Sequence, residues 1–125
     1  MQVLLDTQAV VLAYIGDQLP RKVIALLSND ETDRFVSAAT IMEVAVKNSI
    51  NKLKMGEAEM QEAIRDLRLM VIPFEPRHAY HMFRLPLHHR DPFDRMIIAT
   101  AFEERLPLVG GDRQFRKYRG LKNIW

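Results

Sequence analysis

Two aspartates lie three positions apart in the segment HRDPFD, at Asp91 and Asp94. Asp91 directly precedes Pro92, which is typical of a helix N-cap followed by proline at the first helical position. Asp94 would then take the third position, where an acid also complements the helix dipole. Apolar residues follow three, four and seven positions further on, at Ile97, Ile98 and Ala101. We therefore expect Asp94 to lie on the side of its helix that faces the core.

Three more acids lie close to the ends of predicted strands. Asp6 directly follows the apolar run 2–5, and Asp112 follows the run 107–110 by way of a glycine pair. Glu43 lies near the start of the helix expected after the second strand. Because the carboxyl ends of parallel strands meet at one edge of a sheet, four carboxylates are predicted to converge there. They are Asp6, Glu43, Asp94 and Asp112.

Each acid also has a purely structural explanation. Asp6 can cap the first helix, Thr40 and Glu43 match the T-x-x-E capping box, and Asp112 suits a loop after paired glycines. Against this, buried carboxylates that lie close together cost several kcal/mol and raise one another's pKa. A divalent cation removes that penalty, and a ligand set of oxygens without cysteine suits Mg²⁺ or Mn²⁺.

The elements that must position these acids alternate between strands and helices. Strands are expected at residues 2–5, 35–36, 71–74, 107–110 and 122–125. Helices are expected at residues 8–16, 21–30, 38–54, 56–70, 75–85, 92–105 and 113–118. This alternation, with short connections, predicts an α/β fold in which helices cover both faces of a parallel sheet. Ligands bind such sheets beyond the carboxyl ends of the strands.

The composition is that of one globular domain over residues 1–125. The chain is 48% hydrophobic and 27% charged, so it can bury a sizeable core. The absence of cysteine excludes disulfides and thiolate metal sites and fits a reducing cytoplasm. No targeting segment or apolar stretch long enough to cross a bilayer is present, so we expect a soluble cytoplasmic protein. The net charge of +2 permits an anionic partner without requiring one.

Four segments, by their order and spacing, resemble the PIN-domain ribonucleases, and more narrowly the VapC-like toxins of type II toxin–antitoxin pairs. They are LLDTQ, SAATIMEVAVKNSINKLK, LPLHHRDPFDRMIIATA and LVGGDRQF. The resemblance implies a three-layer α/β/α sandwich with a central, mostly parallel sheet. It also implies a site for Mg²⁺ or Mn²⁺ at Asp6, Glu43, Asp94 and Asp112, with Asp6 and Asp94 as the most direct ligands. Asp91 remains a cap or an outer residue of this site.

The same resemblance implies a metal-dependent endoribonuclease, a cognate antitoxin as partner and a homodimer, with no membrane association. A metal-activated water would attack RNA and leave a 5′-phosphate and a 3′-hydroxyl. The apolar segments 8–16 and 22–27 are candidate partner surfaces, although core packing explains them equally. One departure is that Gly110 and Gly111 stand where relatives often have Thr or Ser before the last Asp.

Basic residues near the acids are candidates for holding the RNA backbone: Lys47, Arg90, Arg95 and Arg113. Arg95 has the alternative of offsetting nearby acids, and Lys47 that of an ordinary surface lysine. Two rival functions remain. One is a non-catalytic RNA- or protein-binding module whose acids only cap helices. The other, less favoured, is a zinc site built from His78, His81, His88 and His89, the last two being read as polar loop residues.

Overall fold

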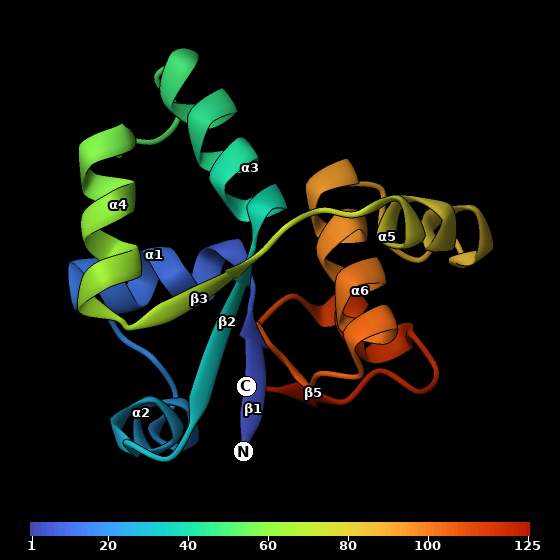
Figure 1. Cartoon of the computed structure of the whole chain (residues 1–125), viewed down its shortest axis with the longest axis horizontal. Coiled ribbons are helices and arrows are strands. Elements are labelled where there is room, and N and C mark those ends of the chain that lie inside the picture. Colours follow the sequence, from blue (N-terminus) through green and yellow to red (C-terminus); the bar gives the residue numbers. More distant parts are fainter.

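A computed structural model describes residues 1–125, and its elements alternate as the sequence predicts (Figure 1). The first half contains β1 (Gln2–Leu5), α1 (Thr7–Ile15), α2 (Arg21–Ser28), β2 (Asp33–Ser37), α3 (Ala38–Ser49) and α4 (Glu57–Asp66). The second half contains β3 (Leu69–Ile72), α5 (Pro76–His81), η1 (Met82–Arg84), α6 (Pro92–Glu104), β4 (Leu108–Val109), η2 (Arg113–Lys117) and β5 (Asn123–Ile124). None of the helices combines the length and apolar character needed to cross a membrane.

The five strands form one sheet in the order β3-β2-β1-β4-β5, and every neighbouring pair is parallel. The strand order reverses at β1, which lies between β2 and β4. The loops that follow β1 and β4 therefore flank the crevice in which such sheets bind ligands.

Helices cover both faces of this sheet (Figure 1). One core contains Val3 and Leu5 of β1 with residues of α1, α2 and α4. The other contains Leu4 with the buried face of α6 and with Phe115 of η2. Since successive residues of a strand point to opposite faces, the three buried residues of β1 supply both cores. The predicted three-layer α/β/α fold with a parallel sheet is thus confirmed.

Some local predictions were wrong. The helices predicted over 38–54 and 56–70 end at Ser49 and Asp66. The third strand covers 69–72 instead of 71–74, because Pro73 has no N–H to donate to the sheet and Arg68 already turns the chain with a φ of 53°. The capping box at Thr40 and Glu43 does not form either. Ser37 caps α3, its hydroxyl accepting from the Ala39 N–H at 3.0 Å, so Thr40 and Glu43 lie inside the helix. Helix capping therefore does not explain why Glu43 is an acid.

Candidate metal centre

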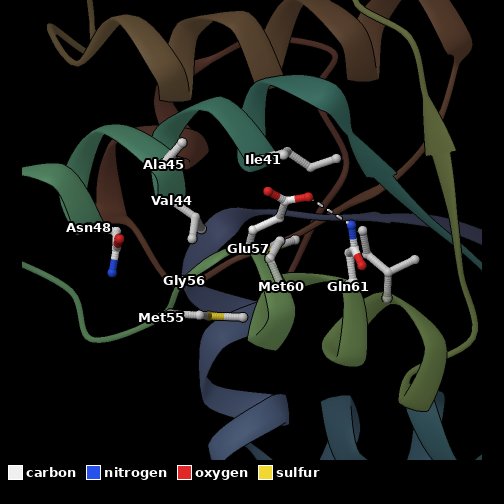
Figure 2. A pocket seen from close by; sticks show the side chains of 10 residues that line it. Ile41, Val44, Ala45, Asn48, Met55, Gly56, Glu57, Met60 and Gln61 are labelled. Carbon is white, nitrogen blue, oxygen red and sulfur yellow. Dashed lines mark hydrogen bonds between the residues drawn. The ribbon is translucent and has the colours of Figure 1, made fainter.

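Two hollows lie on either side of α3. One is an apolar groove of about 460 Å³ between α3 and α4, lined by residues such as Ile41, Val44, Met55 and Met60 (Figure 2). The other is a polar cavity of about 400 Å³ at the carboxyl edge of the sheet. All four predicted acids line the polar cavity, namely Asp6, Glu43, Asp94 and Asp112. The structure thus brings together four carboxylates that are far apart in the sequence.

Asp6 directly follows β1 and is as buried as Glu43, with 3% of its surface exposed. It caps α1, its Oδ1 accepting from the Ala9 N–H at 2.8 Å, as the capping hypothesis predicted. Its Oδ2 faces Gly110, where an added Cβ would lie 2.5 Å away. Burial raises the pKa of Asp6 to about 7. The hydrogen bond from the Ala9 N–H lowers the pKa only in part, and repulsion from the other three acids of the cavity raises it further.

Asp94 lies in the first turn of α6, on the side that continues into buried Ile97 and Ile98. Asp91 caps the helix by accepting from the Asp94 N–H at 3.0 Å, as predicted. The Asp94 side chain retains 19% exposure and lines the cavity. Burial raises the pKa of Asp94 to about 6, opposed by His89 and assisted by repulsion from nearby acids. The helix therefore presents this acid to the cavity.

Glu43 has a partner on each carboxylate oxygen. The Thr7 hydroxyl donates to its Oε1 at 2.5 Å, and the Lys47 ammonium donates to its Oε2 at 2.6 Å. The Thr7 hydroxyl also lies 3.1 Å from the hydroxyl of Thr40. These two threonines supply hydroxyls near the acids, whereas the glycine pair before Asp112 has none. Gly110 is instead needed for space beside Asp6.

Asp112 caps the short helix η2, its Oδ1 accepting from the Gln114 N–H at 2.8 Å. Its Oδ2 lies 2.8 Å from Nε2 of His89. Burial raises the pKa of Asp112, but the hydrogen bonds from Gln114 and His89 outweigh it and leave the pKa below its usual value. Asp112 is therefore a carboxylate that other groups already hold in place.

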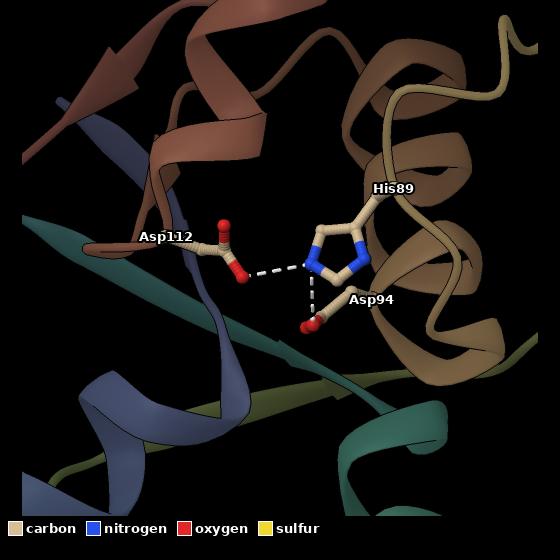
Figure 3. A group of neighbouring side chains, drawn as sticks. All are labelled: His89, Asp94 and Asp112. Carbon is tan, nitrogen blue, oxygen red and sulfur yellow. Dashed lines mark hydrogen bonds and ion pairs between the residues drawn. The ribbon is translucent and has the colours of Figure 1, made fainter.

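His89 is a residue of this site that sequence reasoning missed. Its Nε2 lies between Asp112 and Asp94, 3.0 Å from Oδ2 of Asp94 (Figure 3). The three side chains bring one potential ligand atom each to within 4.8 Å of one another. The available signal was its position two residues before the helix cap Asp91, which ties it to the start of α6.

The other histidines lie elsewhere. His78 is fully buried and pairs with Glu104, His81 pairs with Glu103, and His88 is exposed beside Tyr118. The four histidines do not converge, so the zinc quartet is wrong.

The family model for the PIN domain matches residues 3–121. This chain belongs to the PIN domain family. No curated protein sequence matches it. The resemblance carried by the four sequence segments is thereby confirmed at the level of the family.

Solved structures share the fold of this PIN domain. VapBC2 from Rickettsia felis, bound to a promoter DNA fragment, matches with a TM-score of 0.73 and 20% identity over 99% of this chain and 98% of that chain. DNA-bound VapBC from Salmonella typhimurium matches with a TM-score of 0.73 and 19% identity over 99% and 97%. A toxin–antitoxin complex from Klebsiella pneumoniae matches with a TM-score of 0.66 and 20% identity over 98% and 96%.

The acids of this PIN domain suit a hard divalent cation. The donors are carboxylate oxygens, which Mg²⁺ and Mn²⁺ prefer. Asp6 Oδ2 and Asp94 Oδ1 have no hydrogen-bond donor from the protein, whereas both oxygens of Glu43 and of Asp112 do. Asp6 is also the acid whose ionisation costs most. A cation bound by Asp6 and Asp94 would offset that cost.

Arg95 has different surroundings from those expected. Arg95 does not face the acids for charge compensation or extend towards a ligand. Its guanidinium donates to the backbone carbonyls of Pro86, Met82, Leu85 and His89, at 3.2 to 3.5 Å. Arg95 thus anchors the loop that carries His89. Lys47 and Lys52, in contrast, line the polar cavity.

Proposed function

We propose that this PIN domain, as a single domain over residues 1–125, is a Mg²⁺- or Mn²⁺-dependent endoribonuclease and the toxin of a toxin–antitoxin pair. PIN domains of VapC toxins are generally nucleases, and the related structures include VapBC complexes. The observation that carries the proposal is the convergence of four carboxylates on one cavity, with a buried Asp6 whose pKa is raised to about 7.

The protein side of the chemistry is divided among the residues around the cavity. A bound divalent cation would supply a Lewis acid that polarises the phosphodiester and lowers the pKa of water. Asp6 and Asp94 would hold it, because each has a carboxylate oxygen without a protein donor. Lys52 and Lys47, the latter paired with Glu43, lie in the cavity wall and would bind phosphate oxygens. Attack by water would leave a 5′-phosphate and a 3′-hydroxyl.

The apolar groove between α3 and α4 is the surface that we assign to the antitoxin. Helix α3 separates this groove from the polar cavity: Glu43 and Lys47 line the cavity, whereas Val44 and Asn48 line the groove. An amphipathic segment bound there would lie across α3 from the acids. This assignment differs from the apolar faces of α1 and α2 expected from the sequence. We further propose a homodimer in the cytoplasm.

RNA cleavage by the purified chain tests the proposal directly. With Mn²⁺ or Mg²⁺ present, the protein should cut RNA and leave 5′-phosphate ends, and EDTA should stop the reaction. Asp94→Asn keeps the size of the side chain and should abolish cleavage in vitro and growth arrest on expression, without loss of the fold by circular dichroism. Full cleavage by the Asp94→Asn protein would overturn the site assignment.

The rival function is a PIN-like module that binds RNA or protein without catalysis. It is favoured only by the capping roles of Asp6, Asp91 and Asp112, each of which the structure contains. Mn²⁺ titration separates the two functions. A nuclease should bind Mn²⁺ by calorimetry and melt at a higher temperature with it, whereas a module whose acids only cap helices should do neither.

A further inference from the structure

The two nitrogens of His89 have different partners. Nδ1 lies 3.1 Å from the backbone nitrogen of Asp91, which donates its N–H to it. Nε2 lies 2.8 Å from Oδ2 of Asp112 and 3.0 Å from Oδ2 of Asp94 (Figure 3). The backbone at His89 is also held, because its N–H donates to the Tyr118 hydroxyl at 3.0 Å. The imidazole is therefore fixed in one orientation between two carboxylates.

The backbone N–H of Asp91 determines which nitrogen of His89 carries the proton. A nitrogen that accepts a hydrogen bond must be unprotonated, so Nδ1 is the bare nitrogen. The neutral imidazole then carries its proton on Nε2, and that N–H donates to Asp112, with Asp94 Oδ2 3.0 Å from the same nitrogen. A metal ligand at Nε2 would need the opposite tautomer, with a proton on Nδ1 facing the Asp91 N–H. Donation and metal ligation by Nε2 are thus mutually exclusive in this loop.

We propose that His89 is a positioning residue that donates its Nε2 hydrogen to the carboxylate of Asp112, beside Asp94, and is not itself a metal ligand. This inference rests on the proposed metal-dependent function, which it deepens. The Nε2–H donated to Asp112, with Asp94 Oδ2 at 3.0 Å from the same nitrogen, reduces the repulsion between the two carboxylates. Asp94 Oδ1 is left without a protein donor, and the hydrogen bond holds the loop after β4 against the start of α6.

The loop HRDPFD assembles this arrangement from its own backbone. The Asp91 N–H selects the tautomer of His89, while the Asp91 carboxylate caps the helix at Asp94. Arg95 secures the preceding loop through backbone carbonyls. Hydrogen bonds of this kind to ligating carboxylates typically change metal affinity by about 10- to 100-fold when removed.

Nitrogen NMR of the uniformly ¹⁵N-labelled protein at pH 7.5 tests the tautomer without any variant. We expect His89 Nε2 to be protonated and Nδ1 bare in EDTA, and the same pattern with saturating Mg²⁺. A proton on Nδ1 in the metal-free protein would overturn the donor role. A switch to protonated Nδ1 on adding Mg²⁺ would overturn the claim that His89 is not a ligand.

Mn²⁺ binding to three variants tests the positioning role. By calorimetry, His89→Leu should weaken Mn²⁺ about 10- to 100-fold, whereas His89→Gln, whose amide can donate a hydrogen, should remain within about threefold of wild type. His88→Gln, at the neighbouring exposed histidine, is the matched control and should bind as wild type. Equal weakening by the Gln and Leu variants, or wild-type affinity in the Leu variant, would overturn the proposal.

Pulsed EPR of bound Mn²⁺ gives an independent readout. We expect no nitrogen coupling from an imidazole ligand; a coupling that His89→Gln removes would show that His89 is a ligand after all. If the wild-type protein bound no Mn²⁺, the proposed nuclease function would fail. The metal-free NMR result would still decide whether His89 donates its Nε2 hydrogen to Asp112.

Discussion

In two clusters of histidine and carboxylate in this PIN domain, a backbone N–H donates to Nδ1 of the histidine, but the two clusters differ in role. Between α5 and α6, Nδ1 of His78 accepts from the Glu75 N–H at 2.9 Å, and Nε2 lies 3.0 Å from Glu104. At the carboxyl edge of the sheet, His89 accepts from the Asp91 N–H and points Nε2 at Asp94 and Asp112. In both places a backbone N–H selects the tautomer.

The clusters differ in their charge balance. Between α5 and α6, Arg77 pairs with Glu104, and His81 and Arg84 pair with Glu103, so each of these acids has a cationic or hydrogen-bonding neighbour. The hydrogen bond from His81 outweighs desolvation and keeps the pKa of Glu103 below its usual value. At the sheet edge, Lys47 is the one cation paired with the four acids, through Glu43. The first cluster is balanced and structural, whereas the second has a deficit of positive charge that a cation can fill.

Replacing one acid in each cluster should give the largest contrast. Asp6→Asn keeps the oxygen that caps α1 but removes the charge that would hold the metal, so RNA cleavage should fall about a thousandfold or more. Glu103→Gln, in the balanced cluster, should cleave within about twofold of wild type. Comparable losses in both variants, measured as initial rates on the same RNA, would end the distinction between the clusters.

The stability of the metal-free protein should depend on pH through the acids at the sheet edge, where positive charge is in deficit. The pKa of Asp6 rises from 3.8 to about 7 on folding, and that of Asp94 rises from 3.8 to about 6. Between these unfolded and folded pKa values, the folded protein therefore binds more protons than the unfolded chain. Stability should therefore fall as pH rises from about 4 to 7, by on the order of a few kcal/mol.

Urea unfolding in EDTA at pH 5 and pH 8 measures this effect. Asp6→Asn should lose most of the pH dependence and should be more stable than wild type at pH 8. A wild-type protein that is as stable at pH 8 as at pH 5 would contradict the charge deficit.

Gly110→Ala tests whether close packing holds the Asp6 carboxylate in place, because it adds a methyl group without changing any charge in the cluster at the sheet edge. The new Cβ would lie 2.5 Å from Asp6 Oδ2 and 2.6 Å from the Phe115 ring, so the Asp6 carboxylate must move. We expect a loss of about 1–3 kcal/mol in stability and weaker Mn²⁺ binding by calorimetry. Gly56→Ala is the steric control, since its nearest neighbour lies 3.4 Å from the added Cβ. Unchanged Mn²⁺ affinity in Gly110→Ala would show that Asp6 is not held in place by this contact.

The smallest effect should come from His81→Gln in the balanced cluster. His81 Nδ1 lies 2.6 Å from Glu103 Oε2 in a partly exposed pair, and such pairs contribute little to stability. The melting temperature should change by no more than roughly a few degrees, with Mn²⁺ affinity unchanged. A marked loss of Mn²⁺ binding in this variant would connect the two clusters and weaken the comparison.

The sequence by itself determined the fold class and the neighbourhood of the four acids. Alternating strands and helices with short connections leave few arrangements other than a parallel sheet covered on both faces. The positions of the acids relative to the strand ends then predict that they converge at one edge of the sheet. The caps at Asp6 and Asp91 were also predictable, because capping depends on contacts within three residues. The capping box at Glu43 failed because the helix starts at the end of β2, where Ser37 is already available.

Only the tertiary structure decided the roles that depend on contacts between distant segments. His89 enters the site because the loop before α6 lies beside the loop after β4, 23 residues away along the chain. Gly110 matters for its distance to Asp6, and Arg95 for carbonyls of a preceding loop. Local patterns predict which residues cap and which are buried. Hydrogen bonds and close approaches across the sheet edge depend on how the elements pack, so a pattern within one segment does not contain them.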